Sequence, residues 1–336
     1  MHDTALVVLV VLVALSFDFT NGFHDTANAI ATSVSTHSLT PRAAVALSAA
    51  MNFLGAFVTL KVAATIGSGV ADVAKVTLLM VLSALIGATA WNLLTWYRGL
   101  PSSSSHALIG GLIGAVGAHL GLGAVKWSVV LSKMILPLVL SPLLGFVAAY
   151  LFMLGIFWVF RSASPRPANR GFRLAQIVSA AFVSFSHGTN DAQKTMGVIT
   201  LALISGHAFS NLTPAHFYVP IWVIYASAAA ISLGTYVGGW RIIRTMGTRL
   251  YKIEPAQGFT AQTVAAVLIQ GASSYGFPVS TTHVVTGSIL GAGSSQKASA
   301  VRWGLGLNIF VAWIITLPMA ALFAAVVYAA LHIFGS

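Results

Sequence analysis

The chain has 336 residues, of which 57% are hydrophobic and 7% are charged, and its formal net charge is +11. Soluble domains carry roughly 25% charged residues. This composition therefore excludes an ordinary soluble protein and indicates an integral membrane protein, as does the mean hydropathy of +0.88. The chain contains no cysteine, so disulfides and thiolate metal sites are excluded as well.

Long apolar blocks recur along the chain. A helical crossing takes about 20 apolar residues, so the repeated blocks exclude a single anchor, and their lack of alternation excludes a β-barrel. The first half contains Ala5–Leu39, Ala43–Ile66, Val76–Tyr97, His106–Leu122 and Trp127–Phe160. The second half contains Leu174–Gly206, Phe217–Gly239, Thr260–Gly276, Val279–Gly293 and Trp303–Phe334. We predict an all-α polytopic membrane protein with five blocks in each half, some of them re-entrant.

A polar, proline-rich and basic segment, residues 161–173, separates the two sets of blocks. We predict residues 1–160 and residues 174–336 as two repeats joined by this linker, which we place in the cytoplasm. Because each half contains an odd number of blocks, the two repeats are expected to be inverted relative to each other. The same count places both termini outside.

The basic residues support this topology. The loops predicted inside carry Arg42, Arg98, Arg161, Arg166, Arg170, Arg173, Arg241, Arg244, Arg249, Lys252, Lys297 and Arg302. The loops predicted outside carry only Lys75 and Lys126. This asymmetry follows the positive-inside rule. It explains the positive net charge without nucleic acid as a partner.

One polar motif occurs twice in apolar surroundings. The first copy is Asn21-Gly-Phe-His-Asp-Thr-Ala-Asn28, and the second is His187-Gly-Thr-Asn-Asp-Ala-Gln-Lys194. If Asp25 is aligned with Asp191, the polar His24 falls on Asn190. Ionisable groups at membrane depth are costly and therefore predict a functional site. We expect the motif to break the block Ala5–Leu39.

A second motif is also repeated. The segment Pro101-Ser-Ser-Ser-Ser-His106 aligns with Pro278-Val-Ser-Thr-Thr-His283, and Gly110 aligns with Gly287. Paired polar interruptions in inverted repeats are typical of secondary transporters, in which the binding site lies between the repeats near the middle of the membrane. The sequence therefore predicts a transporter with a two-part site.

Asp25 and Asp191 are the two acidic residues that occupy matching places in the repeat. A pseudo-two-fold axis would bring them, with Asn28 and Asn190, into one central region. Carboxylate and amide oxygens are ligands that Na⁺ requires, whereas a buried carboxylate could instead carry a proton. A structural role at a helix break is the alternative. Asp18 has no acidic counterpart and is expected at most behind the site.

The hydroxyl groups of residues 102–105 and 280–282 follow a proline and open apolar segments. Hydroxyls at a helix start are ordinary N-caps. A helix N-terminus also offers free N–H groups and the positive end of the helix dipole to an anion. Two such ends that converge from opposite leaflets would surround a tetrahedral oxyanion such as phosphate or sulfate.

Other ionisable side chains border these motifs. We expect a supporting role behind the site for His24, His106, His187 and His283, with a direct role as the alternative. Lys194 could contact the anion, pair with Asp191 or extend toward the membrane interface. Two rival classes are an intramembrane hydrolase with a metal at His24, Asp25 and His187, and a passive anion channel. Neither requires the doubled hydroxyl motifs together with the paired carboxylates.

These motifs resemble a known family. Residues 22–32 and 187–191, with the segments Gly99–His106 and Gly276–His283, are similar to the paired signatures of the PiT family of inorganic phosphate transporters. The resemblance implies two inverted halves, often a homodimer in the lipid of the cell (inner) membrane. It also implies uptake of phosphate, free or as a metal–phosphate complex, coupled to Na⁺ or H⁺ without a resident cofactor. A sulfate permease of the same family is the alternative.

The resemblance also implies the binding residues by their motif positions. The residues expected to bind phosphate are Asp25, Asn28, Ser103, Ser104, Ser105, Asp191, Lys194, Ser280, Thr281 and Thr282. The residues expected to bind the coupling cation are Asp25, Asn28, Asn190 and Asp191. Ser104-Ser105 stands where many members have Ser-Thr, so the hydroxyl group is kept.

Overall fold

The computed structural model describes residues 2–335, whose regular elements are helices apart from an isolated bridge between Thr213 and His216. The first half contains α1 (His2–Ser35), α2 (Pro41–Gly55), α3 (Lys61–Gly69), η1 (Val73–Lys75), α4 (Leu78–Arg98), α5 (Ser104–Leu120), η2 (Leu122–Ala124), α6 (Trp127–Val129), η3 (Val130–Ile135) and α7 (Leu136–Val159). The second half contains α8 (Pro165–Ser205), α9 (Ile221–Val237), α10 (Trp240–Arg244), η4 (Thr245–Arg249), α11 (Pro255–Ser274), α12 (Thr281–Ser294), η5 (Ala298–Ala300) and α13 (Trp303–Gly335). The all-helical prediction is confirmed.

Several helices have the length and composition of membrane spans. Within the described residues, four stretches qualify on their own, namely Thr4–Ser35, Leu78–Arg98, Trp127–Val159 and Trp303–Ile333. Residues 221–237 and 240–249 add a fifth if this pair, bent by 57°, is one span. The prediction of a multi-pass membrane protein is therefore confirmed. The predicted block Ala43–Ile66, however, is divided into α2 and α3.

The polar motif does not break the first helix. α1 is continuous from His2 to Ser35, so the predicted interruption of Ala5–Leu39 is wrong, and the second copy of the motif likewise lies inside the continuous helix α8. A membrane favours main-chain groups that bond within their own helix. The polar side chains find their partners on neighbouring helices, so the main chain does not have to open.

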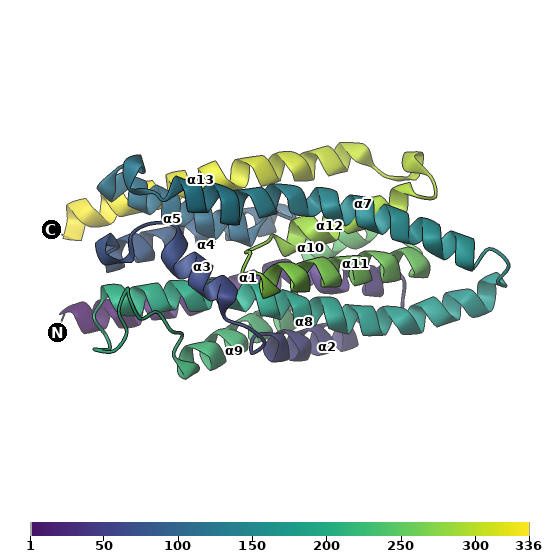
Figure 1. Ribbon diagram of the computed structural model, residues 1–336. Coiled ribbons are helices and arrows are strands. Elements are labelled where there is room, and N and C mark those ends of the chain that lie inside the picture. The colour runs from purple at the N-terminus through teal and green to yellow at the C-terminus, as the bar shows by residue number, and fades with distance from the viewer. Residues whose placement is uncertain (1, 336) are drawn as a thin grey trace.

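The predicted linker, residues 161–173, is mostly helical. α7 ends at Val159, and Pro165 already begins α8, since proline suits the first helical turn. α8 contains 41 residues, which at 1.5 Å per residue is about 60 Å. An apolar membrane layer is about 30 Å thick. The turn between α7 and α8 therefore projects at one end of the bundle, and both chain termini lie at the other end (Figure 1).

Two helical hairpins bring short helices into the middle of the bundle. The α4–α5 hairpin turns at Gly99 (φ 66°) and the α11–α12 hairpin at Gly276 (φ 78°), backbone values that favour glycine. α5 and α12 then lie toward opposite ends of the molecule (Figure 1). The N-termini of α5 and α12 lie close together, as the 4.6 Å between the ring centroids of His106 and His283 shows. The helices are thus re-entrant at the hydroxyl motifs, as predicted.

Each short helix packs closely on one long helix. α5 packs on α13, with Gly110 and Gly114 directly against the carbonyl oxygens of Leu317 and Ala321. α12 packs on α7, with Gly287 and Gly291 directly against the carbonyl oxygens of Pro142 and Phe146. Small residues spaced by four let membrane helices approach in this way. The elements thus recur in the same order in both halves, while the inverted relation of the halves stays a prediction.

Candidate functional site

The carboxylates of the two motifs lie deep inside the bundle. Asp25 of α1 is 2% exposed, and Asp191 of α8 is 0% exposed. Asn21, Asp25 and Asn28 follow a spacing of four and three residues, which places them on one face of α1. His187, Asp191 and Lys194 follow the same spacing on α8. Each helix therefore presents one carboxylate flanked by two polar neighbours.

Asp25 accepts hydrogen bonds from both re-entrant hairpins. Ser104 Oγ of α5 donates to Asp25 Oδ2 at 3.0 Å. Thr281 and Thr282 of α12 donate to its two oxygens, each at 3.4 Å. His24 Nδ1 lies 2.6 Å from Asp25 Oδ1. The carboxylate thus lies where α1, α5 and α12 meet.

Asp191 is paired with a cation from its own helix. Lys194 Nζ lies 2.6 Å from Asp191 Oδ1 and donates to Ser105 Oγ at 2.5 Å and to the carbonyl oxygen of Val279 at 3.0 Å. Asn21 Nδ2 of α1 donates to Asp191 Oδ2 at 3.4 Å. Lys194 therefore pairs with Asp191, one of its predicted roles, and its side chain is buried rather than extended toward the interface.

The predicted hydroxyl groups divide into two kinds. Ser103 and Ser280 are N-caps, which accept hydrogen bonds from the main-chain N–H groups of His106 and His283 at 3.1 and 3.3 Å. The residues that follow each cap are the ones that face the carboxylates. Ser104, Thr281 and Thr282 reach Asp25, and Ser105 reaches Lys194. Helix capping and contact with the charged side chains are thus divided between neighbouring residues of the same motif.

The side-chain amides of Asn28 and Asn190, both predicted as cation ligands, lie in different surroundings. Asn28 Nδ2 donates to Thr282 Oγ1 at 2.9 Å, so Asn28 lies beside the Asp25 cluster. The structure does not bring Asn190 to the carboxylates. Its amide donates to Ser273 Oγ at 2.8 Å and to the carbonyl oxygen of Phe277 at 3.2 Å. Consecutive residues of a helix point in different directions, so Asn190 fastens the α11–α12 turn while Asp191 faces the site.

Of the four histidines predicted to border the site, His24 and His187 contact the carboxylates directly. His187 Nε2 lies 3.4 Å from Asp191 Oδ2 and 3.9 Å from Asp25 Oδ2, and therefore stands between them. His187 Nδ1 is 3.0 Å from Asn52 Oδ1, which fixes the ring. His24 Nε2 lies 3.3 Å from Ser102 Oγ, so His24 links Asp25 to the turn before α5. His24 corresponds to Asn190 in the aligned motifs. His24 contacts the turn before α5, and Asn190 contacts the turn before α12.

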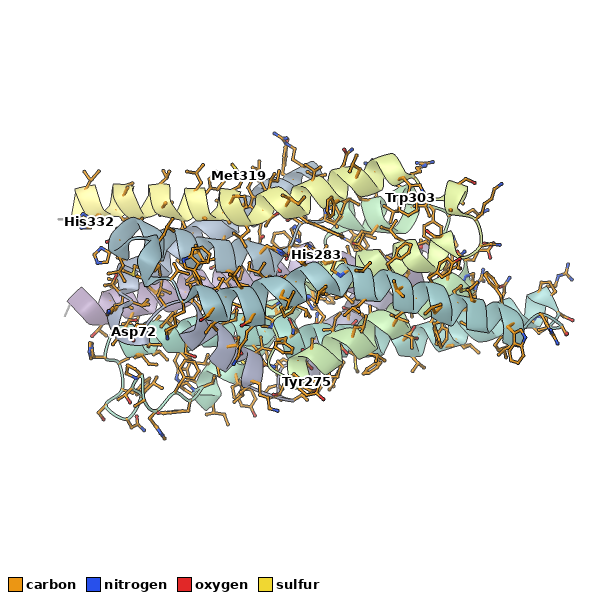
Figure 2. All side chains as sticks on the ribbon, turned by 45° about the horizontal axis from the view of Figure 1, so that its top comes forward. Asp72, Tyr275, His283, Trp303, Met319 and His332 are labelled. Carbon is orange, nitrogen blue, oxygen red and sulfur yellow. The ribbon has the colours of Figure 1, made fainter. Side chains whose placement is uncertain are left out.

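His106 and His283 support the helix starts from behind. His106 Nδ1 lies 2.8 Å from the cap oxygen of Ser103. His283 stacks on Trp313 with centroids 3.9 Å apart, and Trp313 Nε1 donates to the carbonyl oxygen of Pro101 at 2.9 Å. His283 lies in the middle of the bundle, away from Asp72 and His332 near one end and Trp303 near the other (Figure 2). These contacts hold the two hydroxyl motifs together.

Helical spacing could have located one further residue of the cluster. Asn21 lies one turn before Asp25, and its contact with Asp191 joins the two motifs across α1 and α8. Asp18 lies a further turn back and is completely buried. Its position on α1 agrees with the expectation that it lies behind the site.

The cluster has the chemistry of a cation site next to an anion site. Asp25, His187 and Asp191 each offer one ligand atom within 4.8 Å of the others. The two carboxylates supply oxygen ligands, which suit hard cations, and His187 supplies a nitrogen. The N-termini of α5 and α12 add hydroxyl and N–H donors at the same place, which suit an oxyanion. Both kinds of ligand therefore converge on Asp25.

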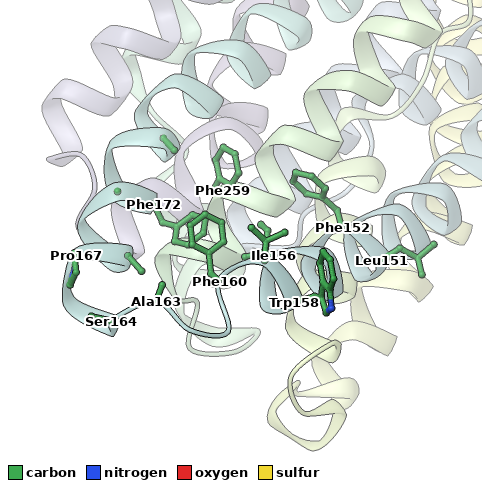
Figure 3. A pocket seen from close by; sticks show the side chains of 15 residues that line it. Leu151, Phe152, Ile156, Trp158, Phe160, Ala163, Ser164, Pro167, Phe172 and Phe259 are labelled. Carbon is green, nitrogen blue, oxygen red and sulfur yellow. The ribbon is translucent and has the colours of Figure 1, made fainter.

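The cluster is closed to both ends of the bundle, since Asp25, Asn28, Asp191 and Lys194 are each at most 3% exposed. A groove of about 870 Å³ lies elsewhere, beside the α7–α8 turn. Its lining, which includes Phe152, Trp158 and Phe259, is apolar and contains none of the predicted site residues (Figure 3). A substrate can therefore reach the cluster only if the helices move.

Comparison with known proteins gives concordant matches. The family described as "Phosphate transporter family" matches residues 21–170 and 161–324. A "Probable low-affinity inorganic phosphate transporter" of Rhizobium meliloti (strain 1021) is 49% identical and covers 96% of each chain. The protein of the same name from Bacillus subtilis (strain 168) is 46% identical, also over 96% of each chain.

A solved structure is similar over the whole fold. It is titled "The sodium-dependent phosphate transporter", and it superimposes with a TM-score of 0.89 at 25% sequence identity. The match covers 98% of this chain and 99% of the other. The relatives are named as transporters and not as enzymes, which agrees with the class expected from the motifs.

Proposed function

Because the chain belongs to the phosphate transporter family, we propose that it imports inorganic phosphate together with a cation by alternating access. The observation that carries this proposal is the convergence of both re-entrant helices on Asp25. Ser104 of α5 and Thr282 of α12 reach the same carboxylate from opposite ends of the bundle. Such a site between two halves is where a rocking transporter binds its substrate.

The charges in the cluster explain why an anion would need a cation. Among the described residues, Asp25 and Asp191 are buried with one ammonium, that of Lys194, so the ionised cluster has one positive charge too few when His24 and His187 are neutral. A phosphate anion entering this region would add a further uncompensated charge at a high cost. A cation bound at Asp25 removes that deficit. Coupling then follows because each ligand raises the affinity for the other.

The nature of the ligands favours phosphate over sulfate. Phosphate keeps at least one proton at neutral pH and can donate it to a carboxylate, whereas sulfate is fully ionised and can only accept. Asp25 and Asp191 are acceptors beside the hydroxyl donors. A buried acceptor left without its partner costs about 1–3 kcal/mol. The carboxylates thus discriminate against sulfate, and the hydroxyl groups bind either anion.

Na⁺ is the coupling ion that the oxygen ligands suit best. The Asp25 cluster offers a carboxylate, two threonine hydroxyls and the Asn28 amide within one small region. The similar solved structure is titled a sodium-dependent transporter. H⁺ carried by Asp25 is the second candidate, because His24 lies 2.6 Å from the carboxylate and could exchange a proton with it.

The arrangement of the ends supports the proposed orientation in the cell membrane. Both termini lie at one end of the bundle and the α7–α8 turn at the other (Figure 1). Arg161, Arg166, Arg170 and Arg173 belong to that turn and the first turns of α8. By the positive-inside rule, the α7–α8 end faces the cytoplasm.

Uptake into proteoliposomes tests the proposal. Wild-type protein should concentrate labelled phosphate when an inward Na⁺ or H⁺ gradient is imposed, and excess sulfate should compete weakly. Asp25→Asn should abolish concentrative uptake, because the amide keeps the shape of the side chain but cannot neutralise the cation. Asp72→Asn is the matched control, since Asp72 is exposed and caps only the short helix η1.

Three results would contradict the proposal. Undiminished gradient-driven uptake in folded Asp25→Asn would show that this carboxylate does not couple the two ions. Phosphate flux that ignores every cation gradient would identify a passive channel. Stronger transport of sulfate than of phosphate would assign the other anion.

A further inference from the structure

The ammonium of Lys194 lies in a cage of oxygen atoms. Its three partners are the Asp191 carboxylate at 2.6 Å, the Ser105 hydroxyl at 2.5 Å and the main-chain carbonyl of Val279 at 3.0 Å. The residue is 1% exposed. Carboxylate, hydroxyl and carbonyl oxygens are also the ligands of hard metal cations in proteins. The nitrogen of Lys194 thus occupies a position built like a metal-cation site.

The other half of the chain contains residues equivalent to those of this cage, with a different residue in the place of the lysine. Asp191 corresponds to Asp25, and Lys194, three residues later, corresponds to Asn28. In the hydroxyl motifs, Ser105 corresponds to Thr282, because each directly precedes the repeated histidine. Val279 corresponds in the same way to Ser102.

The contacts follow this correspondence. Lys194 donates to Ser105, and Asn28 donates to Thr282 at 2.9 Å. Lys194 contacts Asp191, the carboxylate of its own helix. In the other half, Thr282 links Asn28 to Asp25, the carboxylate of helix α1, at 3.4 Å. The two clusters therefore share equivalent carboxylate and hydroxyl residues. They differ in that one contains a covalently attached cation and the other an amide.

We propose that Lys194 is a tethered cation that permanently fills one of two equivalent cation sites, and that a free coupling cation binds only in the other. The free cation would be held by Asp25, Asn28, Thr282 and the main-chain carbonyl of Ser102. This inference rests on the proposed function, since it assigns the number and place of the coupling ions in that transport. It makes Lys194 a determinant of how many cations accompany each anion.

The arrangement has a direct energetic consequence. A site filled by a side chain pays no association entropy in each transport cycle, whereas a free cation must be captured each time. The Asp191 half is thus neutral at any salt concentration, and only the Asp25 half responds to the cation gradient. Replacing Lys194 with asparagine would recreate the ligand set of the Asp25 half and open a second free site.

The test compares Lys194→Asn with Lys61→Asn in purified, full-length protein. Lys61 also donates to a main-chain carbonyl, that of Ser274 at 2.9 Å, but it is exposed and has no carboxylate partner in the part of the chain that the structure describes. In Lys194→Asn, equilibrium binding of radiolabelled Na⁺ should rise by about one ion per chain. The melting temperature of this variant should also depend more steeply on Na⁺ concentration than that of wild type, as mass action requires. Lys61→Asn should match wild type in both.

Asn28→Lys provides a second and independent arm. This variant places an ammonium in the remaining cage. Na⁺ and pH should then no longer alter the affinity for phosphate. Concentrative uptake should be lost, while phosphate binding persists. A folded Lys194→Asn variant with unchanged Na⁺ binding would overturn the inference. So would an Asn28→Lys variant whose phosphate affinity still depends on the cation.

These results separate the inference from the proposed function. If wild-type protein concentrates phosphate in a cation gradient but Lys194→Asn gains no Na⁺, the proposed function stands and the tethered-cation inference fails. If wild-type protein transports no phosphate, the proposed function fails, and the Na⁺ count in Lys194→Asn still tests the cage by itself.

Discussion

The site joins two regions that differ in how their helices are built. α1 and α8 run through the middle of the bundle without interruption, so they contribute side chains alone. α5 and α12 begin there, and they contribute hydroxyl groups together with free main-chain N–H groups. Negative charge thus comes from continuous helices, and hydrogen-bond donors come from helix ends.

The difference indicates a division of tasks between the two regions. Carboxylates on continuous helices can hold a cation without unsatisfied main-chain groups nearby. Helix N-termini carry the positive end of a dipole and suit an anion. Asp25 lies at the boundary, since it belongs to α1 but accepts hydrogen bonds from α5 and α12. A cation and an anion bound on either side of this boundary would meet there.

The largest effect is expected at Asp191, because its loss leaves the Lys194 ammonium buried without a carboxylate. Breaking one partner of a buried ion pair costs about 3–5 kcal/mol. Asp191→Asn should therefore lower the free energy of unfolding by about that amount. Asp25→Asn should lower it less, since among the described residues Asp25 is paired with the histidines His24 and His187 and with no lysine or arginine. Denaturation in detergent, followed by the fraction folded, measures both variants.

A double variant distinguishes charge from packing at this position. Asp191→Leu combined with Lys194→Met removes both charges, keeps the number of side-chain heavy atoms nearly unchanged, and should recover most of the stability, because apolar replacement of a buried pair is often neutral. Transport should stay absent. Equal destabilisation by Asp191→Asn and Asp25→Asn would contradict the special role of the Lys194 pair.

An intermediate effect is expected at the helix ends. Ser104→Ala removes a donor to the Asp25 carboxylate, and hydrogen bonds to charged groups contribute about 1.5–3 kcal/mol. We expect the KM for phosphate to rise about tenfold or more, with little change in the amount of folded protein. Ser83→Ala is the control, because within residues 2–335 its buried hydroxyl donates only to the carbonyl of Leu79 on its own helix. Equal KM values for the two variants would contradict a binding role for Ser104.

Much of this arrangement could be predicted from the sequence, because it depends on repetition. The duplicated motifs placed Asp25 and Asp191 in equivalent positions, and the hydroxyl runs after Pro101 and Pro278 located the starts of the re-entrant helices. Apolar composition and length identified the membrane class. These features are local and periodic, so they can be read without knowing which helices are neighbours.

The remaining features depend on contacts between distant segments. The break expected in α1 is absent because His24, Asp25 and Asn28 have hydrogen-bond partners on other helices, α4, α5 and α12. The sequence alone cannot show these partners. Asn190 was grouped with Asp191 because the two are adjacent in sequence, although their side chains point to different neighbours. The cage around Lys194 likewise combines residues from three separate segments of the chain.

The smallest effect is expected where the short helices rest on the long ones. Gly114→Ala would place a methyl group against the carbonyl oxygen of Ala321 and push α5 away from α13. Overpacking of this kind costs about 1–3 kcal/mol. At the lower of these costs, we expect the melting temperature to fall by about 2–4 °C. We also expect a modest loss of phosphate affinity. Gly155→Ala is the matched control, since nothing lies within 4 Å of its added methyl group. Gly291→Ala should repeat the effect at the contact of α12 with Phe146. If Gly114→Ala and Gly291→Ala lower stability but leave phosphate affinity unchanged, the hydroxyl groups are positioned by their caps and turns alone, and the packing of α5 and α12 contributes only to the fold.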